Sequence, residues 1–188
     1  MSFLTEEELK KLGFNYIGKN VKISNRASIY NPELISIGDN SRIDDFCVLS
    51  GKINIGKNVH IAVMCNLAGG EKGIFMEDFS GLAYNCQVFT QSDDYTGRTL
   101  TNPTIPDEFK KELKKEIIIE KHVIVGTSSI IFPGVKLREG SSVGAMTMVT
   151  KSTEPWKMYF GIPAKIIKDR KKDLLELEKK YLETIKNE

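Results

Sequence analysis

Aliphatic side chains recur at every sixth position over long stretches of this chain. A period of six fits neither an α-helix, which repeats every 3.6 residues, nor a strand, which alternates every two. It fits a triangular coil, in which three short strands and three tight corners make one turn around an aliphatic interior. The register positions are Ile17, Ile23, Ile29, Ile37, Ile43, Leu49, Ile55, Ile61, Leu67, Met76, Leu82, Val88, Ile119, Val125, Ile131, Leu137, Val143 and Val149.

Two further regularities accompany this register. The residue after the aliphatic one is often Gly or Ala, which relieves crowding at a corner. Four residues after the aliphatic position stands a small side chain, and Cys47, Cys65 and Cys86 all obey this rule. We therefore interpret the cysteines as small buried hydrophobes. The pattern predicts an all-β fold, a parallel β-helix of hexapeptide repeats over residues 15–165.

Segments outside the repeat predict two helices and a loop. Thr5 followed by Glu8 is a capping-box signature, and Gly13 suits a helix end, so residues 1–14 predict a short helical cap. Apolar residues at helical spacing predict a C-terminal helix over residues 166–188. Between Val88 and Ile119 the repeat breaks for about 25 residues, and an insertion of this length in a compact repeat is usually functional. We assign it to a loop over residues 93–116.

The charge balance narrows the classes of partner. The chain has 27 basic and 25 acidic residues, a net charge of +2, which implies no strong field for nucleic acid or an anionic membrane. The first residues lack the basic and apolar regions of a signal peptide. Three cysteines without a CxxC pair favour a reducing compartment over a disulfide framework. We expect a cytoplasmic protein that binds neither nucleic acid nor a membrane.

The last coil carries the most specific motifs. Val143-Gly144-Ala145 leads to Lys151, and Tyr159-Phe160-Gly161-Ile162-Pro163-Ala164-Lys165 follows. This stretch resembles the final coil and exit motif of the hexapeptide-repeat acyltransferases that use acetyl-CoA. The resemblance implies a left-handed helix, an exception to the usual handedness of parallel crossovers. It also implies a homotrimer that binds acetyl-CoA in a groove between adjacent subunits.

The same resemblance implies a set of residues that contact acetyl-CoA. Small residues would let backbone amides approach the coenzyme, and lysines would meet its phosphates. Corner geometry alone is an equal explanation for the glycines, and a solvated surface position is one for the lysines. The implied set is Gly126, Gly144, Ala145, Lys151, Pro163 and Lys165.

The galactoside and maltose acetyltransferases of this family open the loop with a histidine. This chain has Thr90-Gln91-Ser92-Asp93-Asp94-Tyr95 there, so Asp93 occupies the position nearest that histidine, and Asn85 matches an upstream asparagine. We assign Ser92 to a small inward position with a structural role. The absent histidine favours an amine acceptor, because a neutral amine needs less help from a base than a hydroxyl does.

The chain has two histidines, His60 and His122, and the register points both outward. A His-Ile-Ala run like that at His60 occurs in nucleotide-sugar acetyltransferases, where the histidine lies near the acyl group; a surface or interface position is the alternative. By the repeat count, His60 and Asp93 lie on different edges of one prism. They would share a site only between subunits of a trimer. We therefore take Asp93 or His60 as the base and Asn85 as a catalytic partner.

The loop sequence points to one branch of the family. Residues 92–97 with residues 101–103 resemble acetyltransferases of O-antigen and capsule pathways, including those acting on dTDP-4-amino-4,6-dideoxyglucose. This implies that Asp94, Tyr95 and Asn102 line the acceptor site, although an ordinary polar turn would also explain them.

We predict an acetyl-CoA-dependent acetyltransferase of a sugar or nucleotide-linked amino sugar, in surface polysaccharide synthesis and without a metal. The first alternative is an O-acetyltransferase of galactoside or maltose type. Two remote alternatives are a γ-type carbonic anhydrase, for which two histidines do not supply the usual zinc ligands, and a non-catalytic assembly subunit.

Overall fold

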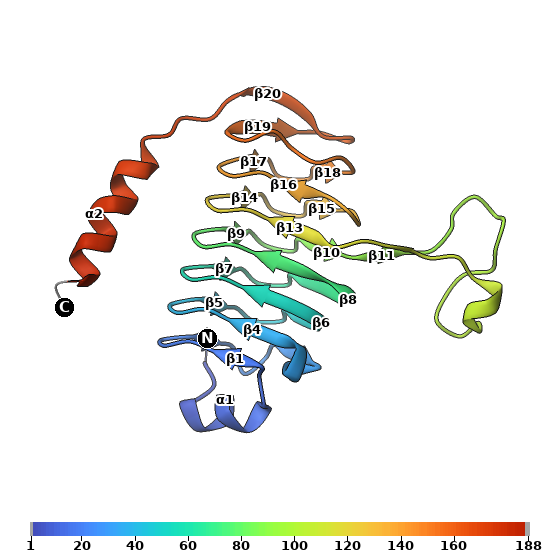
Figure 1. Cartoon of the computed structure of the whole chain (residues 1–188), viewed down its shortest axis with the longest axis horizontal. Coiled ribbons are helices and arrows are strands. Elements are labelled where there is room, and N and C mark those ends of the chain that lie inside the picture. Colours follow the sequence, from blue (N-terminus) through green and yellow to red (C-terminus); the bar gives the residue numbers. More distant parts are fainter. Residues whose placement is uncertain (1, 187–188) are drawn as a thin grey trace.

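The structure is a computed structural model that describes residues 2–186. The chain winds into a parallel β-helix with three flat faces, and short corners join one face to the next (Figure 1). Within the described residues the coils span 16–30, 35–50, 53–68, 74–89, 117–131 and 136–149. The hexapeptide register of the sequence therefore corresponds to six stacked coils.

The three faces alternate along the chain in the order A, B, C. Face A contains β1 (Tyr16–Ile17), β4 (Ile35–Ile37), the second halves of β6 (Val48–Ile55) and β8 (Asn66–Met76), β13 (Ile117–Ile119) and β16 (Lys136–Leu137). Face B contains β2 (Lys22–Ile23), β5 (Arg42–Ile43), β7 (His60–Ile61), β9 (Gly81–Leu82), β14 (Ile124–Val125), β17 (Ser142–Val143) and β19 (Lys157–Phe160). Face C contains β3 (Ser28–Tyr30), the first halves of β6 and β8, β10 (Gln87–Phe89), β15 (Ile130–Ile131) and β18 (Met148–Val149).

The hydrophobic register is the core of the prism. Ile43, Ile61 and Leu82 are paired in register on face B, and each is at most 2% exposed. The three cysteines are buried and free, as predicted. Stacking like residues in successive coils buries most of the inward positions and satisfies the backbone between neighbouring strands.

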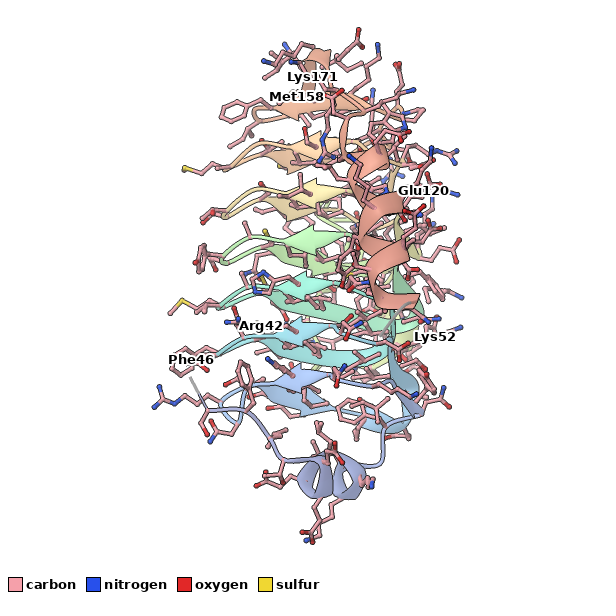
Figure 2. All side chains as sticks on the ribbon, turned by 90° about the vertical axis from the view of Figure 1, so that its left-hand side faces the viewer. Arg42, Phe46, Lys52, Glu120, Met158 and Lys171 are labelled. Carbon is pink, nitrogen blue, oxygen red and sulfur yellow. The ribbon has the colours of Figure 1, made fainter. Side chains whose placement is uncertain are left out.

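The corners require unusual backbone. Residues at the A–B corner, the first corner, have positive φ in successive coils, and so do residues at the B–C corner, the second corner. Asn is the residue that adopts this region most readily after Gly, but Phe, Met and His also occupy it here. The first-corner positions are Asn20, Asn40, Asn58, Phe79 and His122, and the second-corner positions are Phe46, Met64, Asn85, Ser128 and Met146. Figure 2 shows face B between these edges, with helix α2 along one side and Phe46 projecting from the other.

The predicted N-terminal cap is confirmed. Helix α1 (Glu6–Leu12) begins at Thr5, which accepts a hydrogen bond from the Glu8 amide, while the Glu8 carboxylate accepts one from the Thr5 amide. Gly13 ends the helix in the left-handed region. Leu9 is buried in the core cluster, so α1 covers the open end of the prism.

The C-terminal segment differs from its predicted boundary. Residues after 165 do not enter a helix at once, because β20 (Lys165–Asp169) turns back antiparallel to β19. Helix α2 (Leu174–Lys186) begins later and lies beside the prism (Figure 1). The β19–β20 hairpin uses the last coil as a template and delays the helix.

The insertion forms an arm that projects from the prism (Figure 1). We call residues 91–114 the arm: it leaves and returns as an antiparallel ribbon of β11 (Gln91–Ser92) and β12 (Leu113–Lys114). A single turn of 3-10 helix, η2 (Asp107–Phe109), lies within it, while η1 (Pro32–Leu34) bridges the first two coils. The inward position predicted for Ser92 is therefore wrong. Thr90 is the last buried residue before the arm, and its hydroxyl donates to the Gly69 carbonyl at 2.7 Å.

Candidate active site

Five of the six residues implied for coenzyme binding gather at the C-terminal end of the second corner. The turn between β19 and β20 lies against β18, where the Met148 amide donates to the Gly161 carbonyl and the Ala164 amide donates to the Met148 carbonyl. This brings the turn to the corner formed by the next coils. The gathered residues are Gly126, Gly144, Ala145, Pro163 and Lys165.

The two glycines of this corner have a structural reason of their own. A Cβ on Gly126 would lie 2.5 Å from the Ala145 nitrogen, and one on Gly144 would overlap the Phe160 ring. Close stacking of successive coils therefore excludes a side chain whether or not a ligand binds. The same absence of side chains leaves a shallow edge of backbone and small residues. That edge suits an extended ligand, so both readings of the glycines remain compatible with the geometry.

Lys151 is separated from this group. It follows β18 at the far end of face C, whereas Lys165 starts β20 beside Pro163. Both lysines are exposed. Of the two predicted lysines, Lys165 is therefore the one close enough to the second corner to contact a coenzyme phosphate bound there.

Asn85 lies on the same second corner, at the coil before Gly126. Its Nδ2 donates to the Ser128 hydroxyl at 3.2 Å, and its Oδ1 accepts from Gln87 at 3.3 Å. The amide plane is thus held by two polar neighbours while the residue itself stays exposed. Asn85 and the five residues above form one line along the prism axis, which we call the donor edge.

His60 lies on face B in β7, where its register partner is Gly81 of β9. Its Nε2 is 2.8 Å from Oδ2 of Asp44, and Nε of Arg42 donates to Oδ1 of the same carboxylate at 2.6 Å. Asp44 is only 4% exposed, whereas about half of the His60 side chain (53%) meets solvent. Neither Asp44 nor Arg42 was singled out from the sequence. The signal was an acidic residue at a position that other coils fill with Gly, Ala or Ser.

His122 lies outside the prism as expected, but it does not reach solvent. It is 7% exposed because α2 covers it: Nε2 is 2.9 Å from Glu178 Oε2, and the ring stacks on Phe79. The backbone carbonyl of His122 also accepts from the Arg170 guanidinium at 2.7 Å. His122 is therefore an anchor for the C-terminal helix, on the edge of a groove that also contains His60.

The predicted acceptor residues all lie in the arm. Asp93 accepts from the Asn102 amide, with both carboxylate oxygens at 3.3 Å, so it closes the loop between them. Hydrogen bonds from the Thr96 hydroxyl and amide hold the pKa of Asp94 below its usual value. Tyr95 is 91% exposed. Asp93, Asp94 and Tyr95 line one hollow of the arm.

Within one chain these groups form three separate places: the donor edge, His60 on face B, and the arm. The expected separation of His60 from Asp93 is found, because the arm leaves the prism from the C–A corner. Among residues 2–186 no group of three or more His, Cys, Asp or Glu side chains converges on a metal position. In the same residues, no helix combines the length and apolarity needed to cross a membrane.

Comparison with known proteins identifies the class. No protein-family model matches the chain. A curated dTDP-4-amino-4,6-dideoxy-D-glucose acyltransferase of Escherichia coli is 41% identical over 181 residues, which cover 95% of this chain and 94% of that protein. AntD, an N-acyltransferase from Bacillus cereus solved with dTDP and 3-hydroxybutyryl-CoA, is 50% identical, with a TM-score of 0.97 over 98% of each chain. A serine-to-alanine variant of AntD, solved with dTDP-4-amino-4,6-dideoxyglucose and coenzyme A, is 51% identical, with a TM-score of 0.96 over 97% of this chain and 98% of that one.

The fold is that of a left-handed β-helix acyltransferase, as the sequence predicted. The chain belongs to the hexapeptide-repeat acyltransferase family, and it is an enzyme that uses an acyl-CoA. The remote alternatives of a carbonic anhydrase and a non-catalytic subunit are set aside by this likeness, which spans nearly the whole chain.

Proposed function

We propose that this enzyme transfers an acyl group from acyl-CoA to the amino group of a dTDP-linked 4-amino-4,6-dideoxy sugar. The observation that carries the proposal is the near full-length likeness to AntD, whose structures hold coenzyme A and that amino sugar. The acyl group is acetyl or a short relative of it, because AntD was also solved with 3-hydroxybutyryl-CoA.

The donor edge is the proposed binding place for acyl-CoA. It is long and shallow, and it runs from Pro163 and Lys165 along Ala145 to Asn85, which suits an extended pantetheine parallel to the prism axis. Lys165 would meet phosphate as a point charge. Bound there, acyl-CoA supplies an activated thioester, and the thioester end would lie toward Asn85 and His60.

The acceptor site is proposed to come from the arm of a neighbouring subunit in a homotrimer. The arm projects beyond its own prism, and its predicted acceptor residues do not contact the donor edge of the same chain. In a closed trimer each interface sets the arm side of one subunit against another face of the next. Asp93, Asp94, Tyr95 and Asn102 of one subunit would then meet Asn85 and His60 of its neighbour.

The chemistry needs one proton acceptor. The amine nitrogen attacks the thioester carbonyl carbon, the C–S bond breaks, and the nitrogen loses a proton. Asp93 or His60 accepts that proton, since both are ionisable groups at the proposed interface. Asn85, held by Ser128 and Gln87, orients the acceptor. A role in surface polysaccharide synthesis, in the cytoplasm, follows from the proposed substrate.

The product distinguishes this function from its alternative. The enzyme is incubated with acetyl-CoA and, separately, dTDP-4-amino-4,6-dideoxyglucose, a UDP-linked 4-amino sugar, a galactoside and maltose, and thiol release is followed. We expect rapid release with an amino-sugar nucleotide and a product of one added acetyl group that resists hydroxylamine, as an amide does. Release only with the hydroxyl acceptors, giving a hydroxylamine-labile ester, would instead establish the O-acetyltransferase alternative.

A further inference from the structure

Asp44 departs from the rule of its own position in the repeat. At the end of each face B strand, where the chain enters the second corner, the structure needs a small residue. The equivalent positions in the six coils are Ser24, Asp44, Ala62, Ala83, Gly126 and Gly144. Asp44 is the ionisable member of this set, and it is 4% exposed. A buried carboxylate is costly unless it is paired, so a residue that breaks the local pattern there needs a compensating reason.

The partners of Asp44 show what the carboxylate does. One oxygen accepts from Arg42 Nε at 2.6 Å, and the other lies 2.8 Å from His60 Nε2. Arg42 and His60 are register partners on the adjacent strands β5 and β7, so the carboxylate bridges two neighbouring side chains of face B. The equivalent position in the next coil is Ala62, whose side chain is small.

An ionised carboxylate only accepts hydrogen bonds, so the 2.8 Å contact requires the proton of neutral His60 to be on Nε2. The other ring nitrogen, Nδ1, then carries the lone pair. Gly81 is the register partner of His60 on the next strand and places no side chain over the ring. About half of the His60 side chain faces solvent. The ring is thus held at Nε2, while the side chain as a whole stays about half exposed.

We propose that Asp44 is a positioning residue, which holds His60 in the Nε2–H tautomer so that Nδ1 accepts the proton of the acceptor amine. This inference rests on the proposed function and deepens it by naming the basic atom. As the amine nitrogen bonds to the thioester carbon and the C–S bond breaks, the ammonium proton passes to Nδ1. His60 then returns it to the departing thiolate sulfur. The Asp44 carboxylate stabilises the imidazolium in between, and Arg42 holds the carboxylate in place.

Other charged groups near His60 do not replace Asp44. The groove beside His60 also contains Glu178, Arg170 and Tyr181 from the C-terminal segment, together with His122. Glu178 is engaged by His122 and Lys121, and Arg170 donates to backbone carbonyls. Tyr181 donates to Asn58.

The tautomer can be read without an activity assay. The chain has two histidines, so ¹⁵N shifts of the ring nitrogens, assigned with His122→Gln, report His60 directly. At roughly pH 8.5, where an imidazole is neutral, we expect His60 to be Nε2–H in the unaltered protein. In Asp44→Asn the preference should be lost, because an amide donates as readily as it accepts. An unchanged His60 tautomer in Asp44→Asn would overturn the proposal.

Kinetics then test whether the positioning serves catalysis. We expect Asp44→Asn to lower kcat by at least about tenfold with an unchanged KM for acyl-CoA. The loss should vanish in a His60→Ala background, as it must for two residues acting as one unit. Asp45→Asn is the matched control, since Asp45 pairs with Ser24 and Arg26 and not with His60. An unchanged kcat in a folded Asp44→Asn protein would also overturn the proposal. If the unaltered enzyme is inactive on every amino sugar, the proposed function is contradicted. The ¹⁵N measurement then decides the His60 tautomer by itself.

Discussion

Nε2 of His122 lies 2.9 Å from Oε2 of Glu178, and this contact joins the first corner of the prism to helix α2. The residues are separated by 56 positions in the chain. Lys121 contacts the other carboxylate oxygen of Glu178 at 2.6 Å, and Tyr181 reaches Asn58 one turn further along α2. Polar contacts and an aromatic stack therefore attach the helix to the prism. Much of the apolar surface of α2, including Leu177, remains exposed and contributes little to this attachment.

This attachment predicts a loss of stability in acid. Burial works to raise the pKa of Glu178, but hydrogen bonds from Lys121 and His122 and their charges outweigh it, so the pKa lies below its ordinary value of 4.5. A depressed carboxyl pKa adds stability above the unfolded value, and that stability is lost as the pH falls through the folded value. We expect protection of α2 against amide exchange to decline below about pH 4.5.

In Glu178→Gln, protection of α2 should already be low at neutral pH and should not change further in acid. We expect a loss of about 2 kcal/mol in the local opening free energy. Glu176→Gln is a matched control on the same helix, because Glu176 pairs with the exposed Lys179. Equal protection of α2 in Glu178→Gln and the unaltered chain would contradict this role.

Gly126→Ala separates two explanations of the donor edge. A Cβ at this position meets the Ala145 backbone at 2.5 Å, which cannot move without shifting the next coil. We expect a loss of about 1–3 kcal/mol in the free energy of unfolding, measured in denaturant. If Gly126 served only the coenzyme, the variant would keep its stability and lose affinity for acyl-CoA.

The two predicted lysines make a matched pair for the coenzyme. Lys165 lies beside Pro163 on the donor edge, whereas Lys151 lies at the far end of face C. We expect Lys165→Ala to raise the KM for acyl-CoA about fivefold, the value of one exposed ion pair near 1 kcal/mol, and the effect should shrink at high salt. Lys151→Ala should leave that KM unchanged. A raised KM in Lys151→Ala with an unchanged KM in Lys165→Ala would mean that the coenzyme phosphates do not bind at the donor edge.

Much of the fold is predictable because each inward position repeats the same requirement. Ile43, Ile61 and Leu82 report the register directly, and the cysteines fit it as small residues. The path of the arm is not predictable in this way. Ser92 satisfies the repeat by spacing, yet its strand pairs with Leu113 in the returning chain, and that long-range pairing leaves no local signal.

The site is less predictable than the fold for a related reason. Spacing places His122 outside the prism, but its burial depends on Glu178 in a distant helix. Asp44 shows the opposite case, because its departure from the Gly, Ala or Ser rule is visible in the sequence. Only the structure shows that the Asp44 carboxylate contacts His60.

We expect the arm residues Asp93 and Tyr95 to serve catalysis and substrate binding and not the stability of the fold. Asp93 and Tyr95 project from a ribbon that contributes little to the core, and Tyr95 is 91% exposed. We expect Asp93→Ala to lower kcat by about 10², because the acceptor amine loses a group that positions it, and Tyr95→Ala to raise the KM for the nucleotide sugar, each with an unchanged Tm. An unchanged kcat in Asp93→Ala would remove this carboxylate from the mechanism.

We propose that one subunit supplies the donor edge and the next supplies the arm. Mixed assemblies of two inactive variants test it most directly: Asp93→Ala alters the arm, and Ala145→Trp blocks the exposed donor edge. Random mixing at equal amounts leaves about one quarter of the interfaces with an intact arm facing an intact edge. We expect recovery of about one quarter of the unaltered activity in coexpressed mixtures. Mixtures that form mixed assemblies yet stay as inactive as the separate variants would contradict it.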